Sequence, residues 1–430
     1  MPVCYFLHPP RNAKQSAIMT LASLRETRKA IAGSFTMQFP CVIHARTGDM
    51  EVHEAYRAAL ETGASTVPYL TTLRVAELPA LQTCLHDANI VARRSSTRDT
   101  SSHGSVTCVT LPGNVRGVVK VMSLCLTNTS KAPGASSRAI SAATHNSSLV
   151  DPYLTCLGSK LAETKRSVGF ARLYATFLAR AAELHGETDV PVVAVVMERL
   201  DDILDKRIAA CMPRDGGTAD WRRLIGLVLQ VMATLAQGQA AFGLVHNDTH
   251  LANFMVSDAR DDHHHHPRRA SLKLAIKGGA VLALPLLERV VLIDFGRASF
   301  ATSRGRVVTS EIDSMFPSWE KNGLQSDVMH FAAMLLLIQP RPRYLEEQAA
   351  LTPQGSAARA LLRLIKAALQ CAGGTLDMHE QYATCHASLT QQCAHDAIHT
   401  LRKTESLCRG ALPLDWLRDA ELVQNFIAPG

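Results

Sequence analysis

The sequence predicts an α+β fold of two lobes, a small strand-rich lobe followed by a larger and mainly helical lobe. At 430 residues the chain exceeds what a single hydrophobic core usually organises. Two strand-like segments, residues 106–111 and 116–122, flank the turn-forming triplet Pro-Gly-Asn at 112–114, which is typical of a hairpin. Residues 221–241 instead repeat apolar side chains at helical spacing with little polar face, so they predict a long buried helix.

The chain is expected to divide at two points. Residues 1–90 contain helical patches but no recognisable chemistry, so they form an N-terminal extension of unknown role. The strand-rich lobe takes residues 91–198, and it ends on the continuous apolar run 192–196, which is typical of a strand covered on both faces. This run leads directly into 197–200, which we interpret as the hinge to the helical lobe at 199–430.

Two insertions and one helix complete the expected organisation. Residues 127–148 are rich in Ser, Thr, Ala, Asn and Gly, which predicts a mobile insertion outside the core. A helix from 151 to 165 follows, with Pro152 in its first turn, and 170–177 predicts another strand. A second insertion, at 257–289, interrupts the helical lobe.

The composition excludes several classes of protein. Hydrophobic residues make up 47% of the chain, charged residues 19% and aromatic residues 5%, which is typical of a globular protein rather than a disordered one. The formal net charge of +7 is spread over single Lys and Arg residues without a clustered run, so we expect no nucleic-acid partner. No apolar run approaches the roughly 18 residues that a membrane span requires. We therefore expect no membrane span, and the oligomeric state stays open.

The cysteines indicate a reducing compartment. The 11 cysteines are scattered from Cys4 to Cys408 without a C-x-x-C pair, which argues against a disulfide framework or a zinc module. A cytoplasmic or nuclear location follows from this pattern. The first 45 residues hold one acid, Glu26, against five basic residues, so organelle targeting stays open beside the simpler interpretation of a flexible basic leader.

The first motif with recognisable chemistry is a loop that runs from His246 to Asn253, followed by an apolar strand. It has the pattern H-x-D-x-x-x-x-N, with Asp248 as the central acid. Phosphoryl transfer requires a carboxylate that orients and deprotonates the attacking hydroxyl, and an amide oxygen five residues later can hold Mg²⁺ on the phosphates. Asp248 is therefore the candidate catalytic base and Asn253 the candidate metal ligand.

The second motif is an apolar strand, residues 290–293, that ends on Asp294, Phe295 and Gly296. Asp294 would hold Mg²⁺ on the phosphates, Gly296 permits the turn that aims this carboxylate, and Phe295 can pack between the lobes as a positional switch. Either motif alone arises by chance fairly often. The two together, in this order and each beside a strand, predict a phosphotransferase that uses ATP and Mg²⁺.

By these residues the chain resembles the protein kinase superfamily over roughly residues 95–340. More narrowly, it resembles the divergent serine/threonine protein kinases of large DNA viruses. Their catalytic loop similarly has the pattern H-N-D-x-H-x-x-N, and a hairpin-like insertion, here 272–287, precedes Asp-Phe-Gly-Arg. The resemblance implies a bilobal protein-kinase-like fold, a protein substrate with a Ser or Thr acceptor, and a virus-infected host cell as one setting.

The resemblance also implies roles for single residues. Asp248 matches the catalytic base, Asn253 and Asp294 match the magnesium ligands, and Lys120 matches the lysine that contacts the α- and β-phosphates. Asp327 matches a helix acid that braces the catalytic loop. The residues that match the nucleotide pocket are Met197 as the gatekeeper, Glu198 and Leu200 through backbone groups toward adenine, and Gly104 with Ser105 in the glycine-rich loop.

The match weakens at two elements of the small lobe. The glycine-rich loop should carry three glycines, because bare backbone amides must close over phosphates, but only Gly104 stands in this place. The helix after Lys120 should present a glutamate, and 155–158, where spacing predicts that acid, contains none. Asp151 lies earlier and Glu163 later, so either could pair with the lysine after a register shift, or the pair is missing.

Further departures concern regulation and the substrate. Asn247 takes the place of the arginine that, in many kinases, clamps a phosphorylated activation loop, so control by such phosphorylation is not expected. His250 lies two residues after the base, where many protein-serine kinases have lysine, and both kinases of small molecules and atypical protein kinases share this pattern, so the substrate class stays open. The segment 297–318 lacks the Ala-Pro-Glu end marker that accompanies peptide docking.

Three functions therefore stay open. The first is a serine/threonine protein kinase, and the second is a kinase of small molecules of the aminoglycoside or choline kinase type. The third is a pseudokinase that binds nucleotide or a partner without transfer, which the poor glycine loop and the missing glutamate favour. The intact set of catalytic residues argues for an active enzyme, and it comprises Lys120, Asp248, Asn253 and Asp294.

Overall fold

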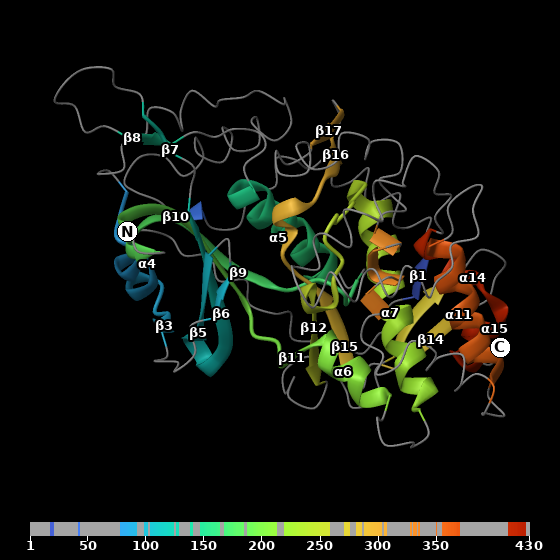
Figure 1. Ribbon diagram of the computed structural model, residues 1–430. Coiled ribbons are helices and arrows are strands. Elements are labelled where there is room, and N and C mark those ends of the chain that lie inside the picture. The colour runs from blue at the N-terminus through green and yellow to red at the C-terminus, as the bar shows by residue number, and fades with distance from the viewer. Residues whose placement is uncertain are drawn as a thin grey trace, which may run out of the picture.

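Figure 1 shows the computed structural model of the chain. Its described part contains both helices and strands, which come in runs rather than in alternation, so the fold is of the mixed α+β kind that was expected. The structure describes residues 18–20, 42–43, 78–92, 99–101, 104–123, 126–128, 138–140, 147–163, 167–184, 187–212, 219–258, 271–275, 281–285, 288–302, 305–307, 327–328, 330–332, 334–335, 350, 355–369 and 412–426.

A sheet of seven strands forms the N-terminal half of the molecule (Figure 1). Its order is β2-β9-β10-β6-β5-β3, and β4 also pairs with β5. All of these pairs are antiparallel except β2 with β9. The strands are β2 (Val42–Ile43), β3 (Val91–Ala92), β4 (Asp99–Ser101), β5 (Gly104–Leu111), β6 (Val115–Ser123), β9 (Leu173–Leu184) and β10 (Glu187–Glu198).

The hairpin expected at 106–122 is confirmed. Strands β5 and β6 pair over their whole lengths and are joined by the single turn η2 (Pro112–Asn114). Gly113 has φ 77° and Asn114 has φ 60°, both in the left-handed region. Glycine and asparagine adopt this conformation more easily than other residues, which explains why this triplet turns the chain.

Side-chain alternation along β6 gives the sheet two different faces. Val119 and Val121 belong to one hydrophobic cluster, which also contains residues of helix α4 (Leu81–Asp87). Met122 belongs to a second and larger cluster that continues through the helical part of the molecule. Because successive strand residues point to opposite faces, Lys120 shares the face of Met122. The register of β6 therefore directs the Lys120 amine toward the helical part.

Helix α5 (Ser147–Glu163) packs against β9 and β10 on one side and against the turn η4 (Phe295–Arg297) on the other. The sequence predicts that this helix begins at residue 151 with Pro152 in its first turn, and this prediction is wrong. The helix begins at Ser147, so Pro152 lies inside it. The hydroxyl of Ser148 donates to the carbonyl of Ser123 at the end of β6 over 2.6 Å. This contact anchors the earlier start of the helix.

Gly158 of helix α5 leaves room for the ring of Phe170 only because it has no Cβ. Gly158→Ala is expected to lower the free energy of unfolding by about 1–3 kcal/mol, because a Cβ at this position would lie 2.6 Å from Cδ1 of Phe170. The matched control is Gly226 in helix α7 (Trp221–Phe242), where a Cβ would meet Phe426 only at 3.6 Å. Gly226→Ala should be neutral or stabilising, since alanine favours helix more than glycine. Urea unfolding measures both, and an unchanged stability in Gly158→Ala would contradict the packing described.

The helical part is built around α7, which is buried along most of its length, as expected. The Asp220 side chain accepts a hydrogen bond from the N–H of Arg223 at its start (3.0 Å), and Gly243 ends it in the left-handed conformation (φ 62°). Within the described residues, α7 alone is long and apolar enough to cross a membrane, but 89% of its apolar window is buried, as in a core helix. Helices α6 (Leu204–Cys211), α11 (Gly355–Leu369) and α14 (Pro413–Arg418) pack on it, and α15 (Ala420–Val423) packs on α11 and α14.

A small sheet of three strands brings together the two sequence motifs. Its order is β11-β12-β15, and its antiparallel strands are β11 (Asp202–Ile203), β12 (Phe254–Asp258) and β15 (Glu288–Leu292). Phe254 is paired with Leu292. The loop that ends at Asn253 therefore lies beside Ile293, whose N–H donates to the Asn253 carbonyl over 3.0 Å.

The hairpin expected between these motifs, at 272–287, is also present. Strand β13 (Ser271–Ala275) pairs antiparallel with β14 (Val281–Pro285), and β1 (Ile18–Thr20) adds to β13 in parallel. Residues 259–270, which belong to the same insertion, lie outside the described residues. The hairpin thus connects the far N-terminus of the chain with the helical part.

Other expected segments are described only in part. Within the insertion expected at 127–148, β7 (Leu126–Asn128) pairs with β8 (Arg138–Ile140) and the last two residues begin α5, while 129–137 and 141–146 lie outside the described residues. Most of the expected extension at 1–90 is likewise outside it, although α4 packs on the sheet. The described part of 297–318 ends at residue 307, after β16 (Phe300–Thr302) pairs with β17 (Gly305–Val307).

Candidate active site

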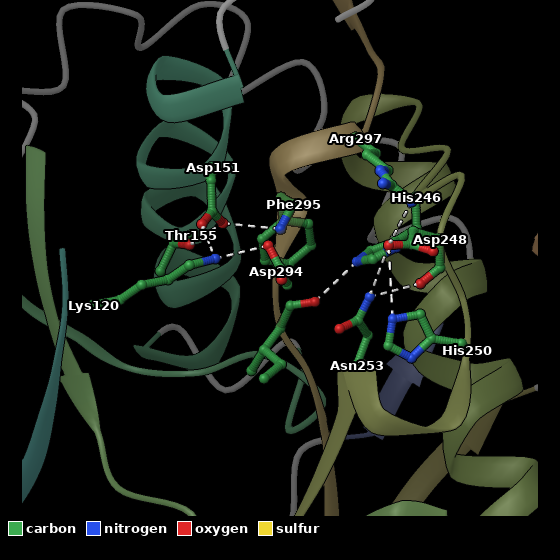
Figure 2. A network of polar contacts seen from close by, with 11 residues as sticks. Lys120, Asp151, Thr155, His246, Asp248, His250, Asn253, Asp294, Phe295 and Arg297 are labelled. Atoms are coloured by element: carbon green, nitrogen blue, oxygen red, sulfur yellow. Dashed lines mark hydrogen bonds and ion pairs between the residues drawn. The ribbon is translucent and has the colours of Figure 1, made fainter. Parts of the chain in front are cut away.

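Lys120 connects the sheet with the helical part through polar contacts and lies at one side of the network in Figure 2. Its side-chain nitrogen Nζ donates to Oδ2 of Asp151 and to Oδ1 of Asp294, each over 2.7 Å. Lys120 is 8% exposed and Asp151 only 1%. Burial opposes the charged form of the amine, but the two carboxylates more than offset it and raise the pKa of Lys120 above its usual value. The lysine is therefore a fixed positive charge.

Asp151 is the acid that pairs with Lys120, which settles the choice left open by the sequence. Its other oxygen, Oδ1, accepts a hydrogen bond from the backbone N–H of Phe295 over 2.8 Å and has the hydroxyl of Thr155 at 3.5 Å. The early position of Asp151 on α5 is compensated by the earlier start of this helix. One carboxylate thus joins the strand β6, the helix α5 and the Asp-Phe-Gly motif.

The backbone of the Asp-Phe-Gly motif has an uncommon conformation. Asp294 has φ 63° and ψ 71°, in the left-handed region, and the short turn η4 follows it. A residue other than glycine is held in this region only where its surroundings determine it, and such positions cluster at functional sites. Here the Lys120 contact fixes the carboxylate, and the Asp151 contact fixes the N–H of Phe295.

The Phe295 ring packs between aromatic side chains of both parts of the molecule. Its centroid lies 6.3 Å from that of Phe170 and 5.4 Å from that of His246. Nε2 of His246 is also 2.9 Å from the carbonyl oxygen of Ile293. The two sequence motifs are therefore held together by ring packing and by a hydrogen bond, in addition to the strand pairing.

The loop that carries Asp248 is held in shape by hydrogen bonds to Asp327, as expected. The Asp327 carboxylate accepts the backbone N–H groups of His246 and Asn247, each over 2.8 Å, and its carbonyl accepts the Thr249 hydroxyl over 2.7 Å. Asp327 is fully buried. Asn247 has φ 64°, a left-handed conformation that asparagine tolerates better than most residues. These contacts determine the shape of the loop before any ligand binds.

Asp248 lies among three polar side chains on the far side of Figure 2 from Lys120. The Asn253 amide nitrogen Nδ2 donates to the Asp248 carbonyl over 2.9 Å and to its carboxylate oxygen Oδ2 over 3.3 Å. Nε2 of His250 lies 3.7 Å and Nη1 of Arg297 3.5 Å from the same Oδ2. Burial lowers the pKa of His250, although the charge of Asp248 acts in the opposite direction. The expected base is thus held by its neighbours and flanked by a permanent charge on Arg297.

The residues expected to contact adenine lie where β10 leaves the sheet. Met197 is opposite Val118 of β6, just as Val195 is opposite Lys120, so Met197 and Lys120 lie on the same face. The N–H of Glu198 donates to the carbonyl of Arg172 over 3.0 Å and is therefore already engaged within the protein. Leu200 follows in the segment that connects β10 with β11, and it is buried.

The Glu198 side chain has a structural role that the sequence did not reveal. Its Oε2 accepts from Nη2 of Arg289 over 2.6 Å, and its Oε1 accepts the N–H of Arg172 over 2.9 Å. Arg289 is 5% exposed. The carboxylate therefore ties the segment at the end of β10 to the first residues of β15.

Arg289→Met is expected to lower the free energy of unfolding by about 1–3 kcal/mol, because it leaves the partly buried Glu198 carboxylate without its cation. In the double variant Arg289→Met with Glu198→Gln, the amide still accepts the N–H of Arg172 and the unpaired charge is gone. The double variant should therefore be more stable than Arg289→Met alone. Guanidinium unfolding measures the difference, and equal stability of the two variants would show that the ion pair contributes little.

The expected glycine-rich loop is described only at its edge. Gly104 and Ser105 open strand β5, where they pair with β4 on one side and β6 on the other. Val106, the next residue, is opposite Lys120. Residues 102 and 103 lie outside the described residues.

The donor set around Asp294 and Asn253 fits a magnesium ion that is bound together with phosphates. Among the described residues no group of three or more His, Cys, Asp and Glu side chains could hold a metal ion. Mg²⁺ is usually bound by one or two protein oxygens, with water and phosphate oxygens completing its octahedron. The Asp294 carboxylate and the Asn253 amide oxygen, whose nitrogen is turned to Asp248, supply such ligands.

Sequence comparisons add no relative to these observations. No model of a known protein family matches the chain, and no curated protein matches it.

Two residues of the site, Arg297 and Thr155, were not among those expected to act there. The sequence signal for Arg297 was only its position directly after Gly296, and for Thr155 it was helical spacing from Asp151.

Proposed function

We propose that this chain is a serine/threonine protein kinase, which transfers the γ-phosphate of ATP to a protein hydroxyl with the help of Mg²⁺. The observation that carries the proposal is the convergence of Lys120 with Asp294 and of Asp248 with Asn253 at the junction of the sheet and the helical part. These residues come from segments far apart in the sequence. Residues of these types in this arrangement are what phosphoryl transfer requires.

The arrangement of the elements supports a bilobal protein-kinase-like fold for this proposal. The seven-stranded sheet with α5 corresponds to the small lobe, and the part built around α7 corresponds to the large lobe. Residues 197–200 connect the two parts. The nucleotide would then lie between Lys120 and Asp294, with adenine near Met197.

In this proposal each polar or charged group of the site has a separate role. Lys120 contacts the α- and β-phosphates, while Asp294 and Asn253 would hold Mg²⁺. The bound ion would neutralise part of the phosphate charge and orient the γ-phosphate. The acceptor oxygen forms its bond to phosphorus as the bond from phosphorus to the bridging oxygen breaks, and the electron pair of that bond leaves with ADP. Asp248 orients the acceptor hydroxyl and takes its proton.

The contact between Lys120 and Asp151 removes one argument for the pseudokinase alternative. That alternative was motivated in part by the missing helix glutamate, and Asp151 supplies a carboxylate at hydrogen-bonding distance from the lysine. His250 beside Asp248 leaves a small-molecule acceptor open, since kinases of small molecules and divergent protein kinases share this pattern. The acceptor class is therefore decided by experiment.

The experiment is a transfer assay with labelled ATP and Mg²⁺. The purified chain and its Asp294→Asn variant are each incubated with a generic basic protein and with a mixed metabolite pool, and self-labelling is recorded. Label on protein that disappears in the variant is expected. Label on a metabolite would replace the protein kinase by a small-molecule kinase. Nucleotide binding without any transfer would replace it by a pseudokinase.

A further inference from the structure

A guanidinium group, that of Arg297, lies near the carboxylate of the expected base Asp248, and Figure 2 shows it above this residue. Nη1 of Arg297 is 3.5 Å from Oδ2 of Asp248. The Arg297 side chain is 21% exposed and that of Asp248 is 18% exposed, so the contact is partly buried at the edge of the site. A charge-assisted hydrogen bond is usually shorter, about 2.7–2.9 Å. The two groups are therefore neighbours at loose contact distance rather than a locked pair.

The backbone of Arg297 is fixed by the loop that carries Asp248. The Asn247 amide nitrogen Nδ2 donates to the Arg297 carbonyl over 3.1 Å. Two residues later, Ser299 and Val245 exchange two backbone hydrogen bonds, of 2.8 and 2.9 Å. The described contacts thus place the arginine with respect to Asp248 by internal groups of the protein, without a phosphate on the segment that follows.

The second basic side chain at this point cannot supply a permanent charge. His250 lies 3.7 Å from the same carboxylate oxygen, but histidine is only partly protonated near neutral pH, and burial lowers the pKa of His250 further. An arginine keeps its charge at any pH that the protein tolerates, and its planar fork fits phosphate oxygens. Arg297 is thus the one permanent cation that the described contacts place next to Asp248.

We propose that Arg297 is a further catalytic residue, which contacts the phosphoryl group during its transfer, and that Asn247 is its positioning residue. This inference rests on the proposed kinase function. The acceptor oxygen bonds to phosphorus while the bridging oxygen leaves with ADP, and the acceptor proton goes to Asp248. Arg297 exchanges no proton and forms no covalent bond. It stabilises the negative charge on the equatorial oxygens of the phosphoryl group, which is the role of a fixed cation in such transition states.

The test compares Arg297→Gln and Arg297→Lys with the wild-type chain. Loss of the charge should lower kcat by about 10²–10³-fold while leaving the KM for ATP within about twofold, because a transition-state contact is removed. Arg297→Lys keeps a point charge and should retain more activity than Arg297→Gln. Arg363→Gln is the matched control, since Arg363 pairs with Asp419 and Glu421 on the surface, and it should keep the wild-type kcat.

Asn247→Gly tests the positioning residue, because glycine accepts the left-handed backbone and only the amide is lost. It should lower kcat by about tenfold without changing the KM for ATP, and the loss of the buried hydrogen bond to the Arg297 carbonyl should also lower the denaturation midpoint. A second readout uses ADP with Mg²⁺ and aluminium fluoride, a mimic of the transferring phosphoryl group. The affinity gain that the fluoride brings should be reduced in Arg297→Gln, whereas the affinity for ADP alone should not change.

The outcomes distinguish a failure of the proposed role of Arg297 from a failure of the proposed kinase function. An active wild-type chain whose kcat and fluoride-dependent affinity are unchanged in Arg297→Gln would overturn the role of Arg297 and leave the kinase intact. A wild-type chain without transfer on any acceptor would overturn the kinase itself. Parallel loss of kcat and of thermal stability in Arg297→Gln, with normal affinity gain from aluminium fluoride, would mean that the arginine is only structural.

Discussion

Lys120→Met is expected to abolish measurable phosphate transfer and to lower the free energy of unfolding by about 3–5 kcal/mol. The methionine fills a similar volume but has no charge, so the Asp151 carboxylate, 1% exposed, loses its cation. The Asp294 carboxylate loses the same partner. Transfer is lost because the phosphates no longer meet the lysine, and stability is lost because a buried charge is left unpaired.

A double variant separates these two effects. In Lys120→Met with Asp151→Asn, the asparagine oxygen can still accept the N–H of Phe295, but the unpaired buried charge is gone. The free energy of unfolding should therefore recover in part, while transfer stays absent. Urea unfolding and the labelled-ATP assay measure the two quantities in the same samples. If the double variant were no more stable than Lys120→Met, the ion pair could not be the origin of the lost stability.

The second large effect is expected at Asp327. Asp327→Ala removes the acceptor of two buried backbone N–H groups, those of His246 and Asn247. A buried donor without a partner costs about 1–3 kcal/mol, so the free energy of unfolding should fall by about 2–6 kcal/mol. The loop around Asp248 would also lose its shape, and transfer should fall with it.

Hydrogen exchange offers the sharpest readout for this variant. In the wild-type chain the two amide hydrogens bound to Asp327 should exchange slowly, and in Asp327→Ala they should exchange much faster. Asp327→Asn keeps one acceptor oxygen and should show an intermediate loss of stability. Unchanged protection of His246 and Asn247 in Asp327→Ala would contradict the bracing contact.

Local signals explain which parts of the fold could be predicted. The β5–β6 hairpin follows from alternating strand residues around Pro-Gly-Asn, and α7 follows from its apolar periodicity. The start of α5 was placed too late because proline favours the first helical turn, whereas Pro152 lies deeper in this helix. The register of Asp151 depends on that start, so the partner of Lys120 could not be chosen from spacing alone.

Tertiary contacts explain what was missed. Glu198 was expected to matter through its backbone, but its side chain also pairs with the buried Arg289, which lies far away in the sequence. No local pattern marks a charged residue as buried, because the partner comes from another element. Arg297 is brought to Asp248 by the pairing of β12 with β15 and by the Asn247 contact, neither of which spacing reveals. Asp248 and Asn253 could be named from their spacing and Asp294 from its local motif, because phosphoryl transfer needs a base and metal ligands, whereas Lys120 was named from the resemblance to protein kinases.

The most direct test of the kinase proposal compares the wild-type chain with Asp248→Asn, by nucleotide binding and by transfer of label from ATP in the same preparations. The proposed mechanism predicts equal affinity for Mg-ATP, because Asp248 acts on the acceptor, and loss of transfer, because the asparagine amide cannot take the acceptor proton. Transfer at the wild-type rate in Asp248→Asn would contradict the mechanism.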